Sequence, residues 1–331
     1  MEHFAEPFDG VAEDQMQGLW TSWNNYFNLA VGVPGMTGNC IRIGTTFATI
    51  QQTLTAAPRW VVSCRMKTDT LKENNFLQLR NGSQIQMEVF TTASGLWKVR
   101  RIGNAGAEAS ASVVVPVEVA TWMELVVDFA TGPTGEYWLY IADQLALHES
   151  GVVTAVGAAQ ADNVRFGIPA GVSGIVYHFD DVALQCGTAE EVDRLLDSQM
   201  TVLPTSADFQ NTNFAPSTGS DLYPLVADAS DATYVSADTA GDQFACDLAD
   251  ETVMNYVHWV QHDLRVLEEA AASRQVKSHL MQGAAHGYGP AFPCSTSPAW
   301  KRTTHLTDPT DAAAWSIAKV NSLKAGAYIE S

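Results

Sequence analysis

The stretch that decides the fold reads FLQLRNGSQIQMEVF and spans residues 76–90. Apolar and polar residues alternate on both sides of Asn81-Gly82, as in Leu77, Gln78, Leu79. Alternation with a period of two places successive side chains on opposite faces of a strand. Asn-Gly is the residue pair that two-residue hairpin turns favour, because both positions need a positive φ. The stretch therefore predicts a β-hairpin with one buried and one polar face.

Similar short runs occur before and after this hairpin. They lie at residues 60–67, 96–100, 113–119, 122–129, 137–141, 165–168 and 175–184. Turn residues separate many of the runs, and residues 4–186 contain no convincing helical periodicity. Many short strands punctuated by turns are typical of an all-β sandwich. We therefore predict a mainly β protein that begins with an antiparallel β-sandwich.

Four segments of this half share a family pattern. They read EPFDG (6–10), WMELVVD (122–128), TGEYWLYIAD (134–143) and FDDV (179–182). In this order they resemble concanavalin A-like or laminin G-like jelly rolls. The resemblance implies two curved antiparallel sheets packed face to face. It implies nothing about a ligand, because a fold of this kind hosts many functions.

A change of pattern follows the predicted sandwich. Thr188 and Glu191 have the spacing of a capping box, and Val192 and Leu195 fall on one helical face. We predict a jelly-roll domain over residues 1–187, a short helical hinge over 188–200, and a second domain over 201–331.

The second half carries a more specific resemblance. Its segments read VLPTSADF (202–209), FAPSTGS (214–220), TAGDQF (239–244) and DPTDAAAW (308–315). In this order they resemble the C-terminal domain of a family of bacteriophage virion structural proteins, often associated with tails or fibres. Members of this family commonly carry a laminin G-like jelly roll in front of that domain. The resemblance implies a virion location after synthesis in the host cytoplasm, with other virion proteins and copies of the chain itself as partners.

The end of the chain has helix signals. Asp308 can cap a helix, Pro309 suits its first position, and Gly326 is a natural terminator. We predict a terminal helix over residues 309–325, which makes the second domain β-rich with a helix at its end. Trp315 belongs to an apolar stripe at helical spacing, so we expect it to pack against a sheet and not to bind a ligand.

Residues 253–282 allow two interpretations. Their Ala, Glu, Gln and Leu content favours a helix by propensity. The family resemblance instead favours a long hairpin, with strands at 254–267 and 275–282 joined by 268–274. We adopt the hairpin.

Charge and composition exclude several classes of protein. Lys and Arg number 18 and Asp and Glu number 37, so the net charge is −19. The hydrophobic share of 46% is too high for a disordered acidic chain. The acidity disfavours nucleic acid and anionic membranes as partners, and no apolar run approaches the roughly 18 residues of a membrane span. Residues 1–6 lack the basic and apolar segments of a secretory signal.

The five cysteines are odd in number and contain no C-x-x-C pair. This spacing gives no support to a zinc ribbon or a redox motif. We expect buried free thiols in a chain that folds in a reducing cytosol.

Catalytic and metal motifs are missing from the sequence. It has no Glu-x-Asp-x-x-Glu run of jelly-roll glycoside hydrolases, and Glu124 and Asp128 lie among core residues. His258 and His262 are four apart but lack the Glu of a zinc motif, so we expect ordinary surface histidines. Asp180 and Asp181 are the metal candidates, as a calcium-binding pair, although a strand points them to opposite faces.

These observations predict a non-enzymatic phage virion structural protein, namely a tail, fibre-associated or capsid-decoration component without a cofactor. Such components usually form symmetric oligomers. The alternative is a carbohydrate-binding adhesin that contacts a host glycan through exposed aromatic residues. A glycan hydrolase is a third possibility, which the missing carboxylate motif disfavours.

Overall fold

A computed structural model gives the structure of the protein. It describes residues 1–6, 8, 20, 22–23, 27–31, 33–34, 36, 39–44, 48–102, 106–167, 174–195, 200–228, 230–252, 257–269 and 274–330. These residues form two compact units, unit 1 up to Met200 and unit 2 from Thr201. Each unit is described by itself.

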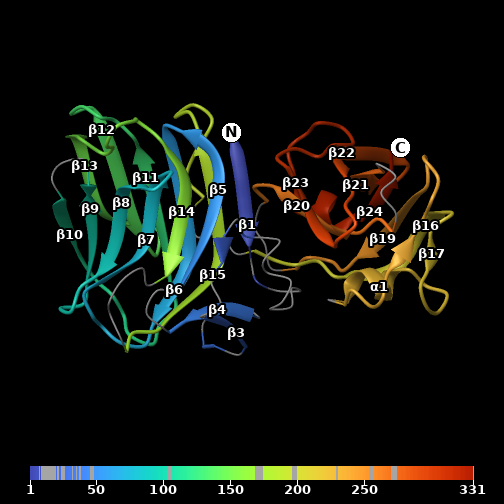
Figure 1. Ribbon diagram of the computed structural model, residues 1–331, viewed down its shortest axis with the longest axis horizontal. Coiled ribbons are helices and arrows are strands. Elements are labelled where there is room, and N and C mark those ends of the chain that lie inside the picture. Colours follow the sequence, from blue (N-terminus) through green and yellow to red (C-terminus); the bar gives the residue numbers. More distant parts are fainter. Residues whose placement is uncertain are drawn as a thin grey trace. The chain divides into compact units, whose positions relative to one another are not determined.

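Unit 1 is built from two antiparallel sheets (Figure 1). The eight-stranded sheet has the order β13 (Gln144–Val152), β12 (Gly135–Ile141), β11 (Thr121–Asp128), β6 (Arg59–Thr68), β15 (Tyr177–Gly187), β4 (Asn39–Ile43) and β3 (Phe27–Val31), and β1 (Glu2–Glu6) also pairs with β15. The seven-stranded sheet has the order β10 (Ala107–Val114), β9 (Leu96–Arg101), β8 (Gln84–Thr91), β7 (Asn74–Asn81), β14 (Ala161–Gly167), β5 (Thr49–Ala57) and β2 (Ser22–Trp23). The predicted jelly-roll sandwich is confirmed.

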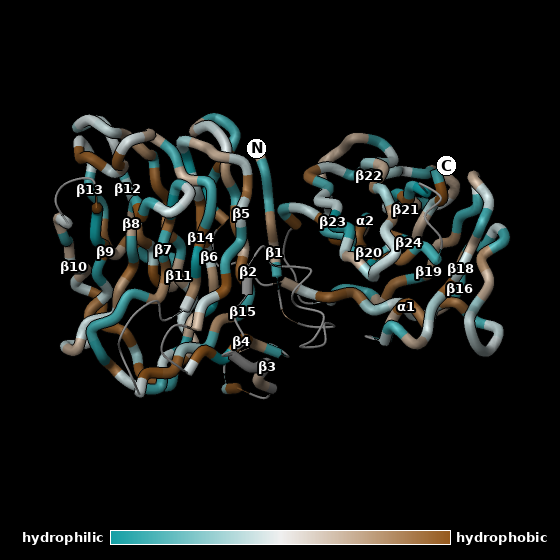
Figure 2. Tube along the Cα trace, in the orientation of Figure 1, coloured by the Kyte–Doolittle hydropathy of each residue, from teal (hydrophilic) through white to brown (hydrophobic). Residues whose placement is uncertain are grey.

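The Asn81-Gly82 hairpin is present between β7 and β8. Asn81 pairs with Gln84, and Gly82 has a φ of 56°. Leu77 and Leu79 are buried against the core, and the intervening polar residues occupy the other face of the sheet. The alternation of hydrophobic and hydrophilic residues along these strands can be followed in Figure 2.

Aromatic side chains fill the space between the two sheets of unit 1. Phe76 contacts the rings of Trp97, Tyr177 and Phe179 at centroid distances of 5.8, 5.5 and 6.1 Å. All four rings are buried. Burial of rings of this size is the largest favourable contribution that a sandwich of this kind offers.

One expectation about unit 1 is wrong in detail. The Val-rich strand runs over Ala107–Val114 and not over 113–119, because its pairing with β9 begins at Ala107.

Two aromatic residues of β12, Trp138 and Tyr140, lie outside the core of unit 1. They are half-buried, Trp138 stacks on His148, and the Arg194 guanidinium lies 3.5 Å from the Tyr140 ring centroid.

The predicted helical hinge is also wrong over residues 188–195. The Thr188 backbone amide donates to the Glu191 carboxylate at 2.9 Å, as the capping-box spacing predicts, and the Thr188 hydroxyl donates to the same carboxylate at 3.1 Å. The structure nevertheless has a turn there and no helix. After one turn, the Leu195 amide donates to the buried Glu124 carboxylate of β11 at 2.6 Å, and this bond holds the chain against unit 1. Residues 196–199 lie outside the described residues.

Unit 2 contains a five-stranded sheet and two small ones (Figure 1). The five-stranded order is β16 (Thr205–Thr212), β19 (Gln243–Leu248), β24 (Leu323–Ile329), β21 (Gln275–Gln282) and β22 (Ala285–Pro293). The small sheets pair β17 (Ala215–Pro216) with β18 (Val235–Ser236), and β20 (Val260–Val266) with β23 (Ala299–His305). The described helices are α1 (Tyr223–Ala227) and α2 (Ile317–Asn321).

For the segment 253–282, the prediction of two strands is correct, but the prediction that they pair with each other is wrong. It forms the two strands β20 and β21, so the helical alternative fails over the described residues. The two strands do not form a hairpin, since β20 pairs with β23 and β21 pairs with β22 and β24. Residues 253–256 and 270–273 lie outside the described residues.

The predicted terminal helix over 309–325 is wrong. The helix α2 covers five residues, and its N-cap is Ser316, whose hydroxyl accepts the Lys319 amide. The chain then continues as strand β24. Gly326 does not terminate a helix. It lies inside β24, where a Cβ would meet the Phe244 carbonyl oxygen at 2.0 Å, so the glycine permits close approach of two strands.

The five thiols are free, as expected, and four are buried while Cys294 is partly exposed. Burial raises the pKa of Cys186 and of Cys246 to about 12. In the described part of the chain, no helix is both long enough and apolar enough to cross a membrane.

Candidate functional site

The predicted metal candidates are anchors of the fold. Asp180 and Asp181 are both buried at a bulge in the pairing of β15 with β6, and Asp181 has a φ of 49°. The Asp181 carboxylate accepts from Arg65 Nε at 3.2 Å and from the Met200 amide at 3.0 Å, and Asp180 accepts the Asp181 amide at 2.9 Å. Among the described residues, no three His, Cys, Asp or Glu side chains are grouped so that they could hold a metal ion.

The two acids of β11 are likewise engaged in ion pairs. Glu124 is buried and accepts from Arg194 Nε at 2.7 Å. Asp128 lies 3.2 Å from Arg59 Nη1, and burial raises its pKa against the opposing effect of Arg59. The charge of the neighbouring Glu136 also raises the pKa of Asp128.

The histidines of unit 2 differ from the expectation. His258 is exposed, but His262 is half-buried in β20, and desolvation lowers its pKa to about 4. The description as a surface histidine is therefore wrong for His262, whose Nδ1 is buried.

A hydrogen-bonded histidine pair in unit 2 was not predicted from the sequence. His279 Nδ1 lies 3.1 Å from the Phe244 carbonyl oxygen, which can only accept, so His279 donates there. His279 Nε2 must then accept from His286 Nδ1 at 2.9 Å. Burial lowers the pKa of His279 to about 4, so this ring is neutral at pH 7.

A row of polar residues crosses the outer face of the seven-stranded sheet in unit 1. Neighbouring strands place its members directly opposite one another in the order Gln51, Arg165, Gln78, Glu88, Arg100, Glu108. Five steps at the usual strand spacing give the row a length of roughly 24 Å. We call this set the polar row.

The β8–β10 end of the polar row is neutralised within itself. Arg100 Nη1 lies 3.3 Å from Glu88, and its Nη2 lies 2.6 Å from Glu108. Lys98 adds contacts to Glu108 at 2.9 Å and to Glu73 at 3.0 Å. Hydrogen bonds from Lys98 and Arg100 lower the pKa of Glu108, and the Glu108 hydrogen bond raises the pKa of Lys98.

The β14–β5 end of the polar row keeps its positive charge. Arg165 Nη2 donates to the Gln51 amide oxygen at 2.9 Å, and within the described residues Arg165 has no carboxylate partner. Arg80, its diagonal neighbour on β7, donates to the Ser83 carbonyl at 2.6 Å and to Gln78 at 3.4 Å. Burial lowers the pKa of Arg165, and the nearby Arg80 charge lowers it further.

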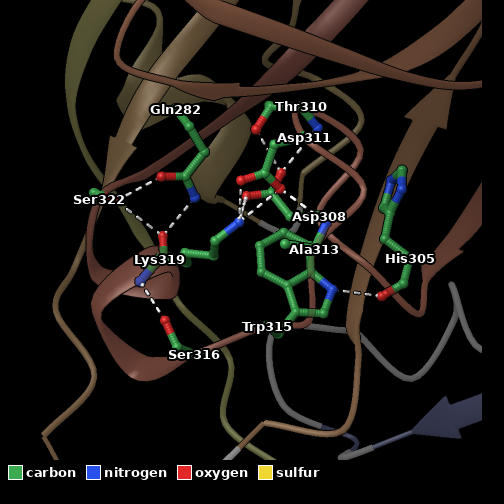
Figure 3. Close-up of polar contacts among 10 residues, drawn as sticks. All are labelled: Gln282, His305, Asp308, Thr310, Asp311, Ala313, Trp315, Ser316, Lys319 and Ser322. Atoms are coloured by element: carbon green, nitrogen blue, oxygen red, sulfur yellow. Dashed lines mark hydrogen bonds and ion pairs between the residues drawn. The ribbon is translucent and has the colours of Figure 1, made fainter.

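The motif DPTDAAAW of unit 2 forms a tight network around one lysine (Figure 3). Lys319 Nζ contacts Asp308 at 2.9 Å and Asp311 at 2.6 Å. The Asp308 carboxylate also accepts the amide and hydroxyl of Thr310, at 2.9 and 2.7 Å. Trp315 is buried, as expected, and its indole donates to the His305 carbonyl at 2.7 Å. We call Asp308, Thr310, Asp311, Trp315 and Lys319 the turn network.

Comparison with known proteins finds similar solved structures but no matching family model and no matching curated protein. Among solved structures, an endo-β-1,4-glucuronan lyase from the fungus Trichoderma reesei covers 56% of this chain and 94% of its own, at 12% identity and a TM-score of 0.42. The cellulose-induced protein Cip1 covers 56% and 98%, at 14% identity and 0.43. The binding domain of a Paraclostridial mosquitocidal protein covers 49% and 43%, at 9% identity and 0.38.

The two antiparallel sheets of unit 1 form a jelly-roll sandwich, and the similarity to these structures concerns the fold alone. The similar structures include a lyase and a binding domain, and their identities and TM-scores are too low to transfer an activity.

Proposed function

We propose that this chain is a non-enzymatic structural component of a bacteriophage virion, in a tail, fibre-associated or capsid-decoration position. Its partners are other virion proteins and further copies of itself. The proposal rests on the sequence resemblance of residues 201–331 to virion proteins of this type.

One structural observation supports this proposal. The segment that carries much of the resemblance, 308–315, is used to build the fold, because its acids neutralise Lys319 and Trp315 is buried. A motif whose polar groups are consumed in this way is suited to a rigid assembly module and not to catalysis. The carboxylates that could have served hydrolysis, Glu124 and Asp128, are held in ion pairs.

The test is the copy number of the chain in purified particles, measured by quantitative mass spectrometry against a major virion protein. The proposal predicts a fixed whole-number ratio that survives density-gradient purification. Absence from the particles, or a trace amount that varies between preparations, would exclude a structural role.

A second function, carbohydrate binding, is favoured by the polar row. Amide, guanidinium and carboxylate groups lie in register across six strands on one face, where Gln78 and Glu88 are buried and the other four members are at least partly exposed. Sugar hydroxyls need this mixture, and a row about 24 Å long matches an extended chain of several units. In a virion protein this function corresponds to an adhesin that contacts a host glycan.

A glycan array with the full chain tests this second function. Saturable binding that falls when the partly exposed Gln51 is changed to Ala, and not when Gln261 in unit 2 is changed to Ala, supports it. An array without any saturable signal contradicts it and leaves the structural proposal unaffected.

A further inference from the structure

We infer that unit 2 contains an acid-sensitive switch, in which the two-stranded sheet β20–β23 separates from the five-stranded sheet when histidines buried between them gain protons. The switch is a property of unit 2 itself, so it goes beyond the virion role and the carbohydrate function proposed above. Four polar residues that interrupt the core of unit 2 form it, and we call His262, Ser278, Thr303 and His305 the polar layer.

The core of unit 2 is divided into two apolar clusters. Val276 belongs to one cluster and Leu280 to the other, and Ser278 lies between them on the same face of β21. Ser278 is fully buried, and its hydroxyl lies 3.1 Å from Nε2 of His305, which is also buried. A polar contact between β21 and β23 therefore crosses the middle of the core.

The same interruption occurs on β20. His262 lies on the face that also carries Val260 and Leu264, which pack against different clusters. It is directly opposite Thr303 of β23, and His262 Nδ1 and Thr303 Oγ1 are both buried without a hydrogen-bond partner. The polar layer is therefore incompletely hydrogen-bonded where β20 and β23 meet the larger sheet.

One acid and two histidines act on His262. Asp263 favours the protonated form, but its carboxylate already accepts from Arg302 Nε at 2.9 Å and from Arg302 Nη2 at 2.7 Å. A positive charge on His305 of β23 or on His279 of β21 opposes a second one on His262. Burial and these two neighbours lower the pKa of His262 to about 4, so the ring is neutral at pH 7.

His305 lies near charged groups that are already paired or that repel a proton. Burial lowers its pKa, against the opposing effect of Asp308. The Asp308 carboxylate contacts Lys319 Nζ of α2 at 2.9 Å (Figure 3). On β23 itself, Lys301 is on the same face as His305 by strand alternation, and its charge has the same sign as a protonated histidine.

Two titratable residues of β22 lie away from the polar layer. Ser278 and His279 are adjacent and point to opposite faces of β21, and His286 and Tyr288 of β22 both contact His279. Toward the polar layer, β22 presents Gly289, where a Cβ would lie 2.9 and 3.1 Å from the two hydroxyls of the layer. Backbone therefore closes the layer on this side, where an acid would be needed to offset a buried positive charge.

Protonation of the polar layer is relieved most simply by separation of the two sheets. A buried charge without a partner is strongly unfavourable, so a conformation in which water reaches the ring becomes favoured. Within the described residues, the β20–β23 sheet shares no strand pairing with the five-stranded sheet. It can therefore separate without loss of ladder hydrogen bonds, and separation hydrates His262 and His305 while the five-stranded sheet persists.

Native-state hydrogen exchange of the full chain, followed in increasing urea at pH 7.5 and pH 5.0, tests the switch. Exchange is corrected for the intrinsic effect of pH. We expect peptides from β20 and β23 to lose protection by roughly tenfold or more at pH 5.0, because one histidine whose pKa falls from 6.5 to about 4 on folding favours opening about 30-fold at that pH. At pH 5.0 these peptides should also show a smaller urea dependence than peptides from β19 and β24, which marks an opening of only part of unit 2.

The variant His262→Gln keeps a polar side chain that cannot gain a proton. It should reduce the loss of protection at pH 5.0 to about a tenth of the parent's loss. His305→Gln should also reduce the loss, and it decides the test if the first variant does not fold. The matched control is His258→Gln, which changes an exposed histidine just before β20 and should keep the parent's loss.

Three outcomes overturn the inference. Equal urea dependence of peptides from β20, β23, β19 and β24 at pH 5.0 would show that unit 2 opens only as a whole. Equal protection of β20 and β23 at the two pH values would show that the polar layer does not respond to acid. A loss that His262→Gln and His305→Gln both leave intact would place the acid response outside the polar layer.

Discussion

Lys319 of unit 2 and Arg165 of unit 1 are both half-buried cations, but their surroundings differ. Lys319 Nζ contacts both Asp308 and Asp311, within 2.9 Å. Arg165 contacts a single amide oxygen. The two partners of Lys319 lie 11 and 8 residues away in the sequence, whereas Gln51 lies 114 residues from Arg165.

The charge of Lys319 stabilises the fold through its ion pairs, whereas the charge of Arg165 forms no ion pair among the described residues. A lysine with two local acids is neutralised whenever the turn forms, so it contributes to folding. Arg165 has no such local acid, so its charge contributes little to folding. The first prediction concerns Asp308→Ala, which disrupts the turn network, and the last concerns Arg165→Gln, which removes the unpaired charge.

The largest effect is expected for Asp308→Ala. The Asp308 side chain is fully buried and accepts bonds from Thr310 N, Thr310 Oγ1 and Lys319 Nζ. Its removal leaves the two Thr310 donors without this acceptor and Lys319 with Asp311 alone, so we expect unit 2 to lose about 2–3 kcal/mol of unfolding free energy. Hydrogen exchange of peptides from unit 2, followed in increasing urea, measures the loss separately from unit 1.

The matched control for this change is Asp231→Ala, which removes an exposed acid from the Arg265 ion pair in the same unit. Exposed pairs contribute at most about 1 kcal/mol. Equal losses for Asp308→Ala and Asp231→Ala would show that the turn network is no more important than a surface ion pair.

This contrast also explains which features were predictable from the sequence. The prediction of a hairpin at residues 76–90 is correct, because the alternation of apolar and polar residues and the Asn-Gly turn are local signals that tertiary contacts reinforce. The motif at 308–315 was noticed but interpreted as a helix start. Asp308 does cap a turn, yet its backbone carbonyl accepts the Ala312 amide and Ala312 has a φ of 61°, which stops a helix.

The polar row was not predictable, since its members come from six strands spread between Gln51 and Arg165. Each strand shows the polar face locally, but the register that aligns them is a property of the sheet. The histidine pair was missed for the same reason, because strand pairing brings His279 beside Phe244 and His286. Only the strand order and register would have identified the polar row or the histidine pair.

An intermediate effect is expected from acidification of unit 2. The pKa of His279 is lowered to about 4 by burial, so the unfolded chain binds a proton at higher pH than the folded one. The contribution of His279 to stability is therefore complete above pH 6.5 and is lost as the pH falls from 6.5 toward 4. At pH 5.5 the loss is about 1 kcal/mol.

Urea titrations at pH 7.5 and pH 5.5 check this dependence. The variant His279→Gln should show a smaller difference between the two pH values than the parent chain. The control is His258→Gln, which changes an exposed histidine of the same unit. If both variants keep the parent's pH dependence, the acid sensitivity of unit 2 has another origin, for which His262 is the next residue to change.

The smallest effect on stability is expected for Arg165→Gln. The substitution removes a cation that has no carboxylate partner among the described residues and that lies near Arg80. It costs the bond to Gln51 and relieves the repulsion between two like charges, and these contributions oppose each other. We expect the unfolding free energy of unit 1 to stay within about 0.5 kcal/mol of the parent, as for a surface change without a buried partner. Urea unfolding of unit 1, followed by hydrogen exchange, measures it. A loss as large as that of Asp308→Ala would mean that Arg165 is structural, and its charge would then not be available for a ligand.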